Sequence, residues 1–222
     1  MRFMTERLEL RPVDDEDFDV AATFFRDPVQ SAVEAGPRPV AQDAAARAAV
    51  VIAESAVIWK RMDYGPLTIR LRDAFVGFCG LRPDLDVDRD APETPPFLFY
   101  AVARPFWRFG IAHEAASACM LWAFEHLGFT QVDAVARPDN HASLNLLGKL
   151  GFAPTGPRRA FGTDLAGFSA CADAQTIRHS AAYPMCCGRS ISRARVLTVA
   201  VRSFTATRPS IEAPAARGRQ PA

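Results

Sequence analysis

The sequence predicts an α/β fold in which helices flank a mixed, largely antiparallel sheet. Short apolar runs that suit strands are interleaved with longer periodic segments that suit helices, in the order β-α-α-β-β-β-α-β-α-β. This order is neither a regular βαβ repeat nor an all-β sandwich. The chain has 222 residues, of which 49% are hydrophobic, so it can bury a substantial core.

The first part of the chain predicts one strand and two helices. Leu8 and Leu10 alternate with charged residues, as expected of a half-buried strand. The acidic segment 14–19 leads into an apolar helix face, and its carboxylates suit the positive end of a helix dipole. After the Gly/Pro cluster at 35–39, residues 40–62 predict a long alanine-rich helix.

The middle of the chain predicts three strands. Residues 67–71 and 75–81 suit a strand pair around a tight turn at Asp73-Ala74. An acidic loop, 84–96, leads to 97–103, which is apolar on both faces and is therefore expected to be a central strand.

The next segments predict the elements on which the functional argument depends. A long helix over about 111–127 ends near Gly128, which suits a C-cap. A strand at 131–137 precedes a short helix at 139–151, capped by Asp139 or Asn140. A further strand starts at Phe152, and beyond about residue 168 the pattern weakens, although 195–204 could form one more strand.

Charge is distributed unevenly along the chain. Residues 171–222 contain eight arginines and two acidic residues, a net charge of +6, so the rest of the chain carries −5. We expect residues 1–168 to form one domain and 169–222 to be an atypical, basic and partly disordered extension. The overall charge of +1 argues against a general nucleic-acid binder.

The cysteines and the N-terminus indicate the compartment. The five cysteines have no spacing typical of a disulfide framework or a zinc site, so we expect no metal. The N-terminal residues lack the apolar core of a signal peptide, and no apolar run is long enough to cross a bilayer. We therefore expect a cytoplasmic protein that does not associate with membranes.

Gly110 marks a candidate anion-binding site at the start of the long helix. A helix start presents unpaired N–H groups and a partial positive charge, and Gly110 and Ala112 leave those groups accessible. Arg108 adds a fixed charge beside them. The glycine motifs of dinucleotide-binding and P-loop proteins are both absent. Taken alone, Gly110 is explained more simply by a tight turn without a ligand.

Four blocks resemble a known family. "TERLELRPV", "FVGFCGL", "FYAVARPFWRFGIAHEA" and "ARPDNHASLNLLGKLGF" resemble, in this order, segments of the GNAT acetyltransferases. The group that they resemble most includes the RimJ/RimL-type protein N-terminal acetyltransferases. The resemblance covers about residues 5 to 160, and its last block is the most specific.

The resemblance implies a GNAT-like sheet and acetyl-CoA as co-substrate. In the family, the strand that matches 97–103 splays from its neighbour, and its backbone pairs with the pantetheine arm. Most of the subgroup has glycine where this chain has Arg108. The implied cofactor-binding residues are Val102, Ala103, Trp107, Arg108, Phe109, Gly110, Ile111, Ala112, His113, Asn140 and Ser143.

The catalytic residues are less well marked. Ser143 matches a family residue that protonates or hydrogen-bonds the departing thiolate, although a serine there could also bond the backbone at the helix start. Related enzymes often have a carboxylate near the position of Phe97, which cannot accept a proton. Glu34 and Glu93 are the alternative candidates for the general base. Tyr100 matches a strand aromatic whose default role is packing.

These observations support an N-acetyltransferase that acts on a primary amine, either a protein N-terminus or a small-molecule amine. The acidic body suits a cationic acceptor, and the resemblance allows a homodimer because family members are often dimers, although nothing in the sequence fixes an interface. The alternative is a catalytically degenerate acyl-CoA-binding module with a regulatory or scaffold role. A third hypothesis, RNA contact by the arginine-rich tail, has little support because the tail has few aromatic residues.

Overall fold

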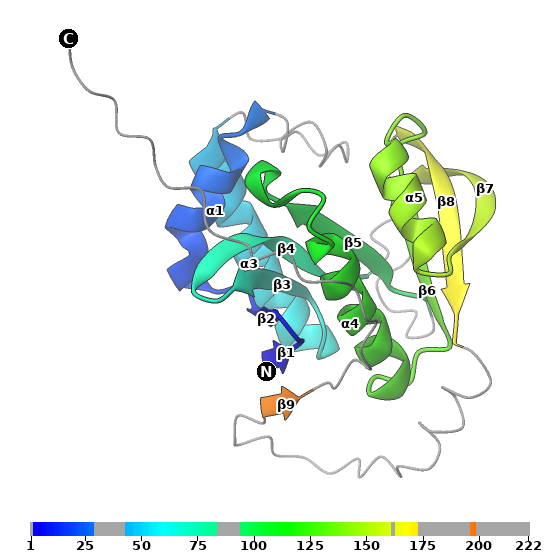
Figure 1. Cartoon of the computed structure of the whole chain (residues 1–222), viewed down its shortest axis with the longest axis horizontal. Helices are drawn as coiled ribbons and strands as arrows, with labels where there is room; N and C mark the ends of the chain where they lie inside the picture. Colours follow the sequence, from blue (N-terminus) through cyan, green and yellow to red (C-terminus); the bar gives the residue numbers. More distant parts are fainter. Residues whose placement is uncertain (1, 29–42, 84–93, 161–162, 173–195, 199–222) are drawn as a thin grey trace.

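The computed structural model describes residues 2–28, 43–83, 94–160, 163–172 and 196–198 (Figure 1). Within them, nine strands form one sheet in the order β7-β8-β6-β5-β4-β3-β2-β1-β9. The strands are β1 (Arg2–Met4), β2 (Leu8–Pro12), β3 (Pro66–Leu71), β4 (Ala74–Arg82), β5 (Phe97–Val102), β6 (Gln131–Ala136), β7 (Ala153–Ala160), β8 (Thr163–Cys171) and β9 (Val196–Thr198).

Helices pack on both faces of this sheet. They are α1 (Phe18–Phe25), α3 (Ala44–Met62), α4 (Ile111–Glu125) and α5 (His141–Lys149), with short 3-10 turns η1 (Asp15–Asp17) and η2 (Arg104–Phe106). α1 and the first half of α3 share one apolar cluster with Phe78 and Ala101. α4 and Leu147 of α5 belong to the larger cluster on the other face, which surrounds the fully buried Trp122. The predicted fold class is therefore confirmed.

The sheet is nearly interrupted in its middle. β5 and β6 run parallel, and along these two fully described strands they are in register only at Phe97 and Asp133. The Asp133 amide also donates to the Pro96 carbonyl, at 2.9 Å. On either side the pairing is continuous, since β4 pairs with β5 over six positions and β6 with β8 over six. Beyond the single pair, β5 and β6 diverge, and the sheet divides into two halves (Figure 1). The gap between the two backbones is termed the opening.

Three details differ from the sequence-based expectations. The hairpin turn after β3 consists of Arg72 and Asp73, because Leu71 pairs with Ala74; Arg72 has a φ of 56°. The N-terminal strand is a pair of strands, β1 and β2, in antiparallel register. The strand β8, which the sequence pattern did not reveal, inserts between β6 and β7 and ends at Cys171, three residues past the expected domain boundary.

The acidic segment before α1 forms a buried ion cluster. Asp17 is fully buried and accepts from Arg11 at 2.7 Å and 3.0 Å, while Arg70 lies 3.4 Å away. Asp14 and Asp17 form a reciprocal capping box. A buried carboxylate is tolerated only when it is paired in this way. The cluster ties the start of α1 to β2 and β3, a more specific role than the helix-dipole interaction expected from the sequence.

Candidate active site

The helix start at Gly110 has the backbone shape that a tight, open turn requires. Gly110 is the N-cap of α4 with a φ of 76°, and its carbonyl accepts from the Glu114 amide at 3.0 Å. Arg108, two residues earlier, also has a positive φ, 68°. Such a conformation costs a side-chain-bearing residue about 1 kcal/mol. Residues 107–110 are all exposed, so solvent reaches the turn that precedes α4, whereas Ile111 at the first position of the helix is buried.

The end of β5 directs a carbonyl group into the opening between the sheet halves. The Ala103 amide donates to the Val76 carbonyl on β4, at 2.8 Å. In a trans peptide the C=O points opposite to the N–H, so the Val102 carbonyl of the same peptide unit points away from β4. There it accepts a hydrogen bond from the indole nitrogen of Trp107. Trp107 itself is 43% exposed.

An arginine that the sequence analysis did not single out holds this loop. Arg7 donates through Nε to Glu114 Oε2 at 2.7 Å and through Nη1 to the Phe109 carbonyl at 3.0 Å. Its backbone amide donates to Glu114 Oε1 at 3.0 Å, and Thr5 Oγ1 donates to the same oxygen. Thr5 and Arg7 belong to the "TERLELRPV" block, but only the fold shows that the block contacts α4.

Tyr100 and Ser143 meet across the opening. Tyr100 lies on β5 and Ser143 in the first turn of α5, which follows β6, and their hydroxyl oxygens are 2.9 Å apart. Burial raises the pKa of Tyr100 from 10.0 to about 12, against the lowering effect of the Ser143 hydrogen bond and with a smaller raising effect from Cys79. The phenol therefore stays protonated across the whole physiological range. Tyr100 is a partner of Ser143 as well as a packing residue.

Asn140 caps α5. Its side-chain oxygen accepts from the Ser143 amide at 3.1 Å, which fixes the first turn of the helix. The backbone of Ser143 is thus used by the cap, whereas its hydroxyl is directed to Tyr100. The alternative expectation for Ser143, a hydroxyl bonded to the backbone at the helix start, is not what the structure shows.

The remaining residues named in the sequence analysis make fewer described contacts in the candidate site. Glu34 and Glu93 lie outside the described residues. His113 is exposed on the first turn of α4. Phe97 is buried, and the guanidinium of Arg158 lies 4.6 Å from its ring centroid. The side chain of Phe97 therefore packs beneath an arginine, at the position where the resemblance predicted a carboxylate.

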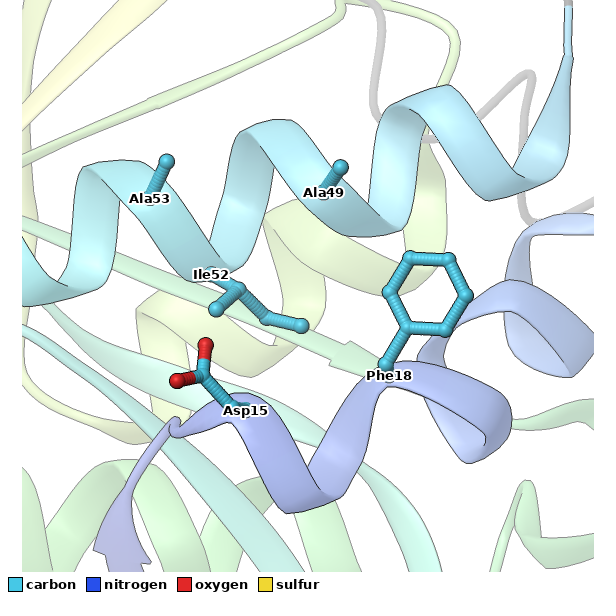
Figure 2. Close-up of a pocket in the computed structure, with 5 residues that line it drawn as sticks. All are labelled: Asp15, Phe18, Ala49, Ile52 and Ala53. Carbon is cyan, nitrogen blue, oxygen red and sulfur yellow. The ribbon is translucent and has the colours of Figure 1, made fainter.

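An open groove lies elsewhere, between η1, α1 and α3 (Figure 2). It encloses about 390 Å³ and is lined by Asp15, Phe18, Ala49, Ile52 and Ala53. Apart from the Asp15 carboxylate, its lining side chains are apolar, and none of the predicted cofactor residues contributes to it. The groove is on the α1–α3 layer, whereas the Tyr100–Ser143 pair is on the α4–α5 face.

α4, with its glycine-capped start, connects β5 to the parallel and diverging strand β6. The family model described as "Acetyltransferase (GNAT) domain" matches residues 7–153. The chain belongs to this family, whose members are N-acetyltransferases that use acetyl-CoA. The part of the chain that the structure describes contains no helix long and apolar enough to cross a membrane.

Known relatives agree with this assignment. An uncharacterised N-acetyltransferase, p20 of Bacillus licheniformis, is 26% identical over 157 residues, which are 71% of this chain and 85% of the relative. The ribosomal-protein-S5-alanine acetyltransferase of Vibrio fischeri superposes with a TM-score of 0.62 at 16% identity, covering 78% of this chain and 98% of that one. RimJ of Mycobacterium smegmatis, in complex with a CoA disulfide, gives 0.60 at 21% identity, with 79% and 88% covered.

Proposed function

We propose that this chain transfers an acetyl group from acetyl-CoA to a primary amine, with a protein N-terminus as the acceptor class. The observation that carries the proposal is the divergence of β5 from β6, together with the exposed, glycine-capped start of α4, the helix that follows β5. Family membership supplies the reaction class. The relatives that are named for ribosomal-protein substrates support a protein α-amine as acceptor.

The opening offers separate contacts for the two ends of the cofactor. The amides that begin α4 would bind the diphosphate, because several N–H groups and the helix dipole favour an anion there. The Val102 carbonyl would bind an amide N–H of the pantetheine arm. The Trp107 indole contacts this carbonyl in the structure, so it would shift or share the oxygen when the pantetheine arm binds.

Direct transfer needs no covalent enzyme intermediate. The neutral amine attacks the thioester carbon, a C–N bond forms, and the C–S bond then breaks. One proton leaves the amine nitrogen and one is taken up by the thiolate sulfur. We assign hydrogen bonding of the thiolate to Ser143, with Tyr100 holding the Ser143 hydroxyl in place. Glu34 and Glu93 remain the candidates for receiving the amine proton, directly or through water.

The first experiment measures binding and turnover on the same protein. Thermal unfolding with acetyl-CoA at about a hundred times its Kd should show a gain of about 2.7 kcal/mol in stability. Short peptides with free N-termini should then release CoA, whereas the same peptides with acetylated N-termini should not. Turnover with small-molecule amines but not with peptides would contradict a protein N-terminus as the acceptor. It would still support acetyl transfer as the reaction.

One observation favours the alternative of an acyl-CoA-binding module without turnover. The strand position where relatives often have a carboxylate holds Phe97, and its ring is covered by Arg158. Stabilisation by acetyl-CoA without CoA release from any amine would support this alternative. The absence of any stabilisation would contradict both functions.

A further inference from the structure

We propose that Arg7 is a positioning residue for the cofactor loop, acting through the Phe109 carbonyl and Glu114. The inference rests on the proposed function, because it assigns Arg7 to the anion-binding end of the same site. Arg7 lies between β1 and β2, about a hundred residues away in sequence from the loop that it contacts.

The contacts form a clamp with three attachment points. The guanidinium donates to the Glu114 carboxylate through Nε and Nη2, at 2.7 Å and 2.6 Å, and to the Phe109 carbonyl through Nη1, at 3.0 Å. Because the guanidinium is a rigid fork, the position of the carbonyl is fixed relative to the carboxylate. The loop residue before Gly110 is thereby held against the first turn of α4.

Charge gives the clamp a second effect. Glu114 is on the helix turn that follows Gly110, so an unpaired carboxylate there would repel a diphosphate at the amides. Arg7 neutralises that carboxylate, which has a side-chain exposure of only 16%. A Cβ built at Gly110 would lie 3.5 Å from Arg7 Nη2, which places the guanidinium next to the proposed anion site. Removal of Arg7 would therefore leave both a looser loop and an uncompensated negative charge.

The same hairpin provides a matched control. Arg2 forms an ion pair with Glu9 at 2.8 Å, and its side chain is 53% exposed. Like the Arg7–Glu114 pair, it joins an arginine to a glutamate, but it connects only β1 to β2. Arg2→Ala should therefore change neither the cofactor loop nor CoA binding.

The test combines CoA affinity by calorimetry with amide hydrogen exchange over residues 106–112, on the full-length protein. Arg7→Ala should weaken CoA binding by at least about tenfold and speed exchange of these amides. Arg7→Lys keeps a charge for Glu114 but loses the fork, so it should keep stability and still speed exchange. If Arg7→Ala does not fold, the lysine variant alone decides the test.

Three results separate the proposals. An Arg7 variant that binds CoA like the wild type, with unchanged exchange, would overturn the clamp. Equal losses of affinity in the Arg7 and Arg2 variants would also overturn it, since the effect would then belong to the hairpin as a whole. If the wild type does not bind CoA, the proposed function fails, and exchange over 106–112 still decides whether Arg7 orders the loop.

Discussion

At the scale of the residue, Gly110 can be tested against a second glycine of the same helix. Gly110 and Gly128 lie at opposite ends of α4 with φ values of 76° and 74°. Leucine at either position is strained to a similar degree, about 1–2 kcal/mol, and a Cβ at either meets no neighbour closer than 3.5 Å. Only Gly110→Leu should abolish CoA binding in calorimetry. Equal binding by both variants would contradict the anion site.

Tyr100 should make the protein sensitive to alkali. Its folded-state pKa of about 12 lies above the value of 10.0 for an unburied phenol, so the stability it contributes is complete below pH 10 and is lost as the pH rises toward 12. The loss approaches about 1.4 kcal/mol per pH unit for one proton. In urea unfolding between pH 9 and pH 11.5, Tyr100→Phe should show a shallower decline than the wild type.

Comparing the wild type with Tyr100→Phe isolates the effect of Tyr100, because both proteins contain the other groups that titrate at alkaline pH. Burial also raises the pKa of Tyr64 and of the Cys79 thiol, and both groups are present in the wild type and in the variant. Parallel pH profiles would show that the Tyr100 phenol is not held neutral. If Tyr100→Phe shows a smaller decline of unfolding free energy with pH and also slower acetyl transfer, both results would support the role of Tyr100 beside Ser143.

Single residues were predictable where their own chemistry restricts them. Gly110, Asn140 and Ser143 are small or polar residues at helix starts, where an unpaired N–H group favours residues of this kind. Tyr100 was expected to pack because an aromatic residue on a strand usually does, and its hydroxyl partner is 43 residues away in sequence. Arg7 was missed for the same reason, since no local pattern indicates which strand end meets which helix.

At the scale of the element, Asn140 is the N-cap of α5 and also a predicted contact of the cofactor arm. Asn140→Asp should keep the cap of α5, because aspartate is as good an N-cap, whereas Asn140→Ala should cost about 1 kcal/mol of stability. If the Asn140 amide group also contacts the cofactor arm, both variants should weaken CoA binding. Chemical denaturation and calorimetry check the two effects separately. Wild-type affinity in the aspartate variant would restrict Asn140 to capping.

Helices and strands were predictable where a repeating pattern of apolar residues or a turn residue marks them. The helices α3, α4 and α5 and the strands β3 to β6 follow from apolar periodicity, Gly and Pro. β8 escaped prediction because its sequence, "TDLAGFSAC", has small residues and no strong alternation. Its place follows from non-local pairing: Gly167 faces Gly156 on one side and Val135 on the other. A side chain at Gly167 would come within 2.7 Å of Thr155 Oγ1.

At the scale of the whole molecule, the domain division stays a prediction and can be tested by truncation. The family match ends at residue 153, and β8 ends at Cys171. We expect a chain that ends after Ala172 to fold and to bind CoA within about twofold of the full-length protein. It would lose β9, which pairs with β1 over three residues at the edge of the sheet. A large loss of melting temperature or affinity would show that the C-terminal segment belongs to the fold.

The single pair between β5 and β6 has a mechanical consequence. A continuous ladder of hydrogen bonds resists bending, so we expect the sheet to bend most easily where only Phe97 and Asp133 are paired, with the Tyr100–Ser143 contact beyond them. A cofactor bound in the opening would contact both halves of the sheet and would restrict their relative movement. The angle between the two halves of the sheet would then differ between the free protein and the complex with CoA.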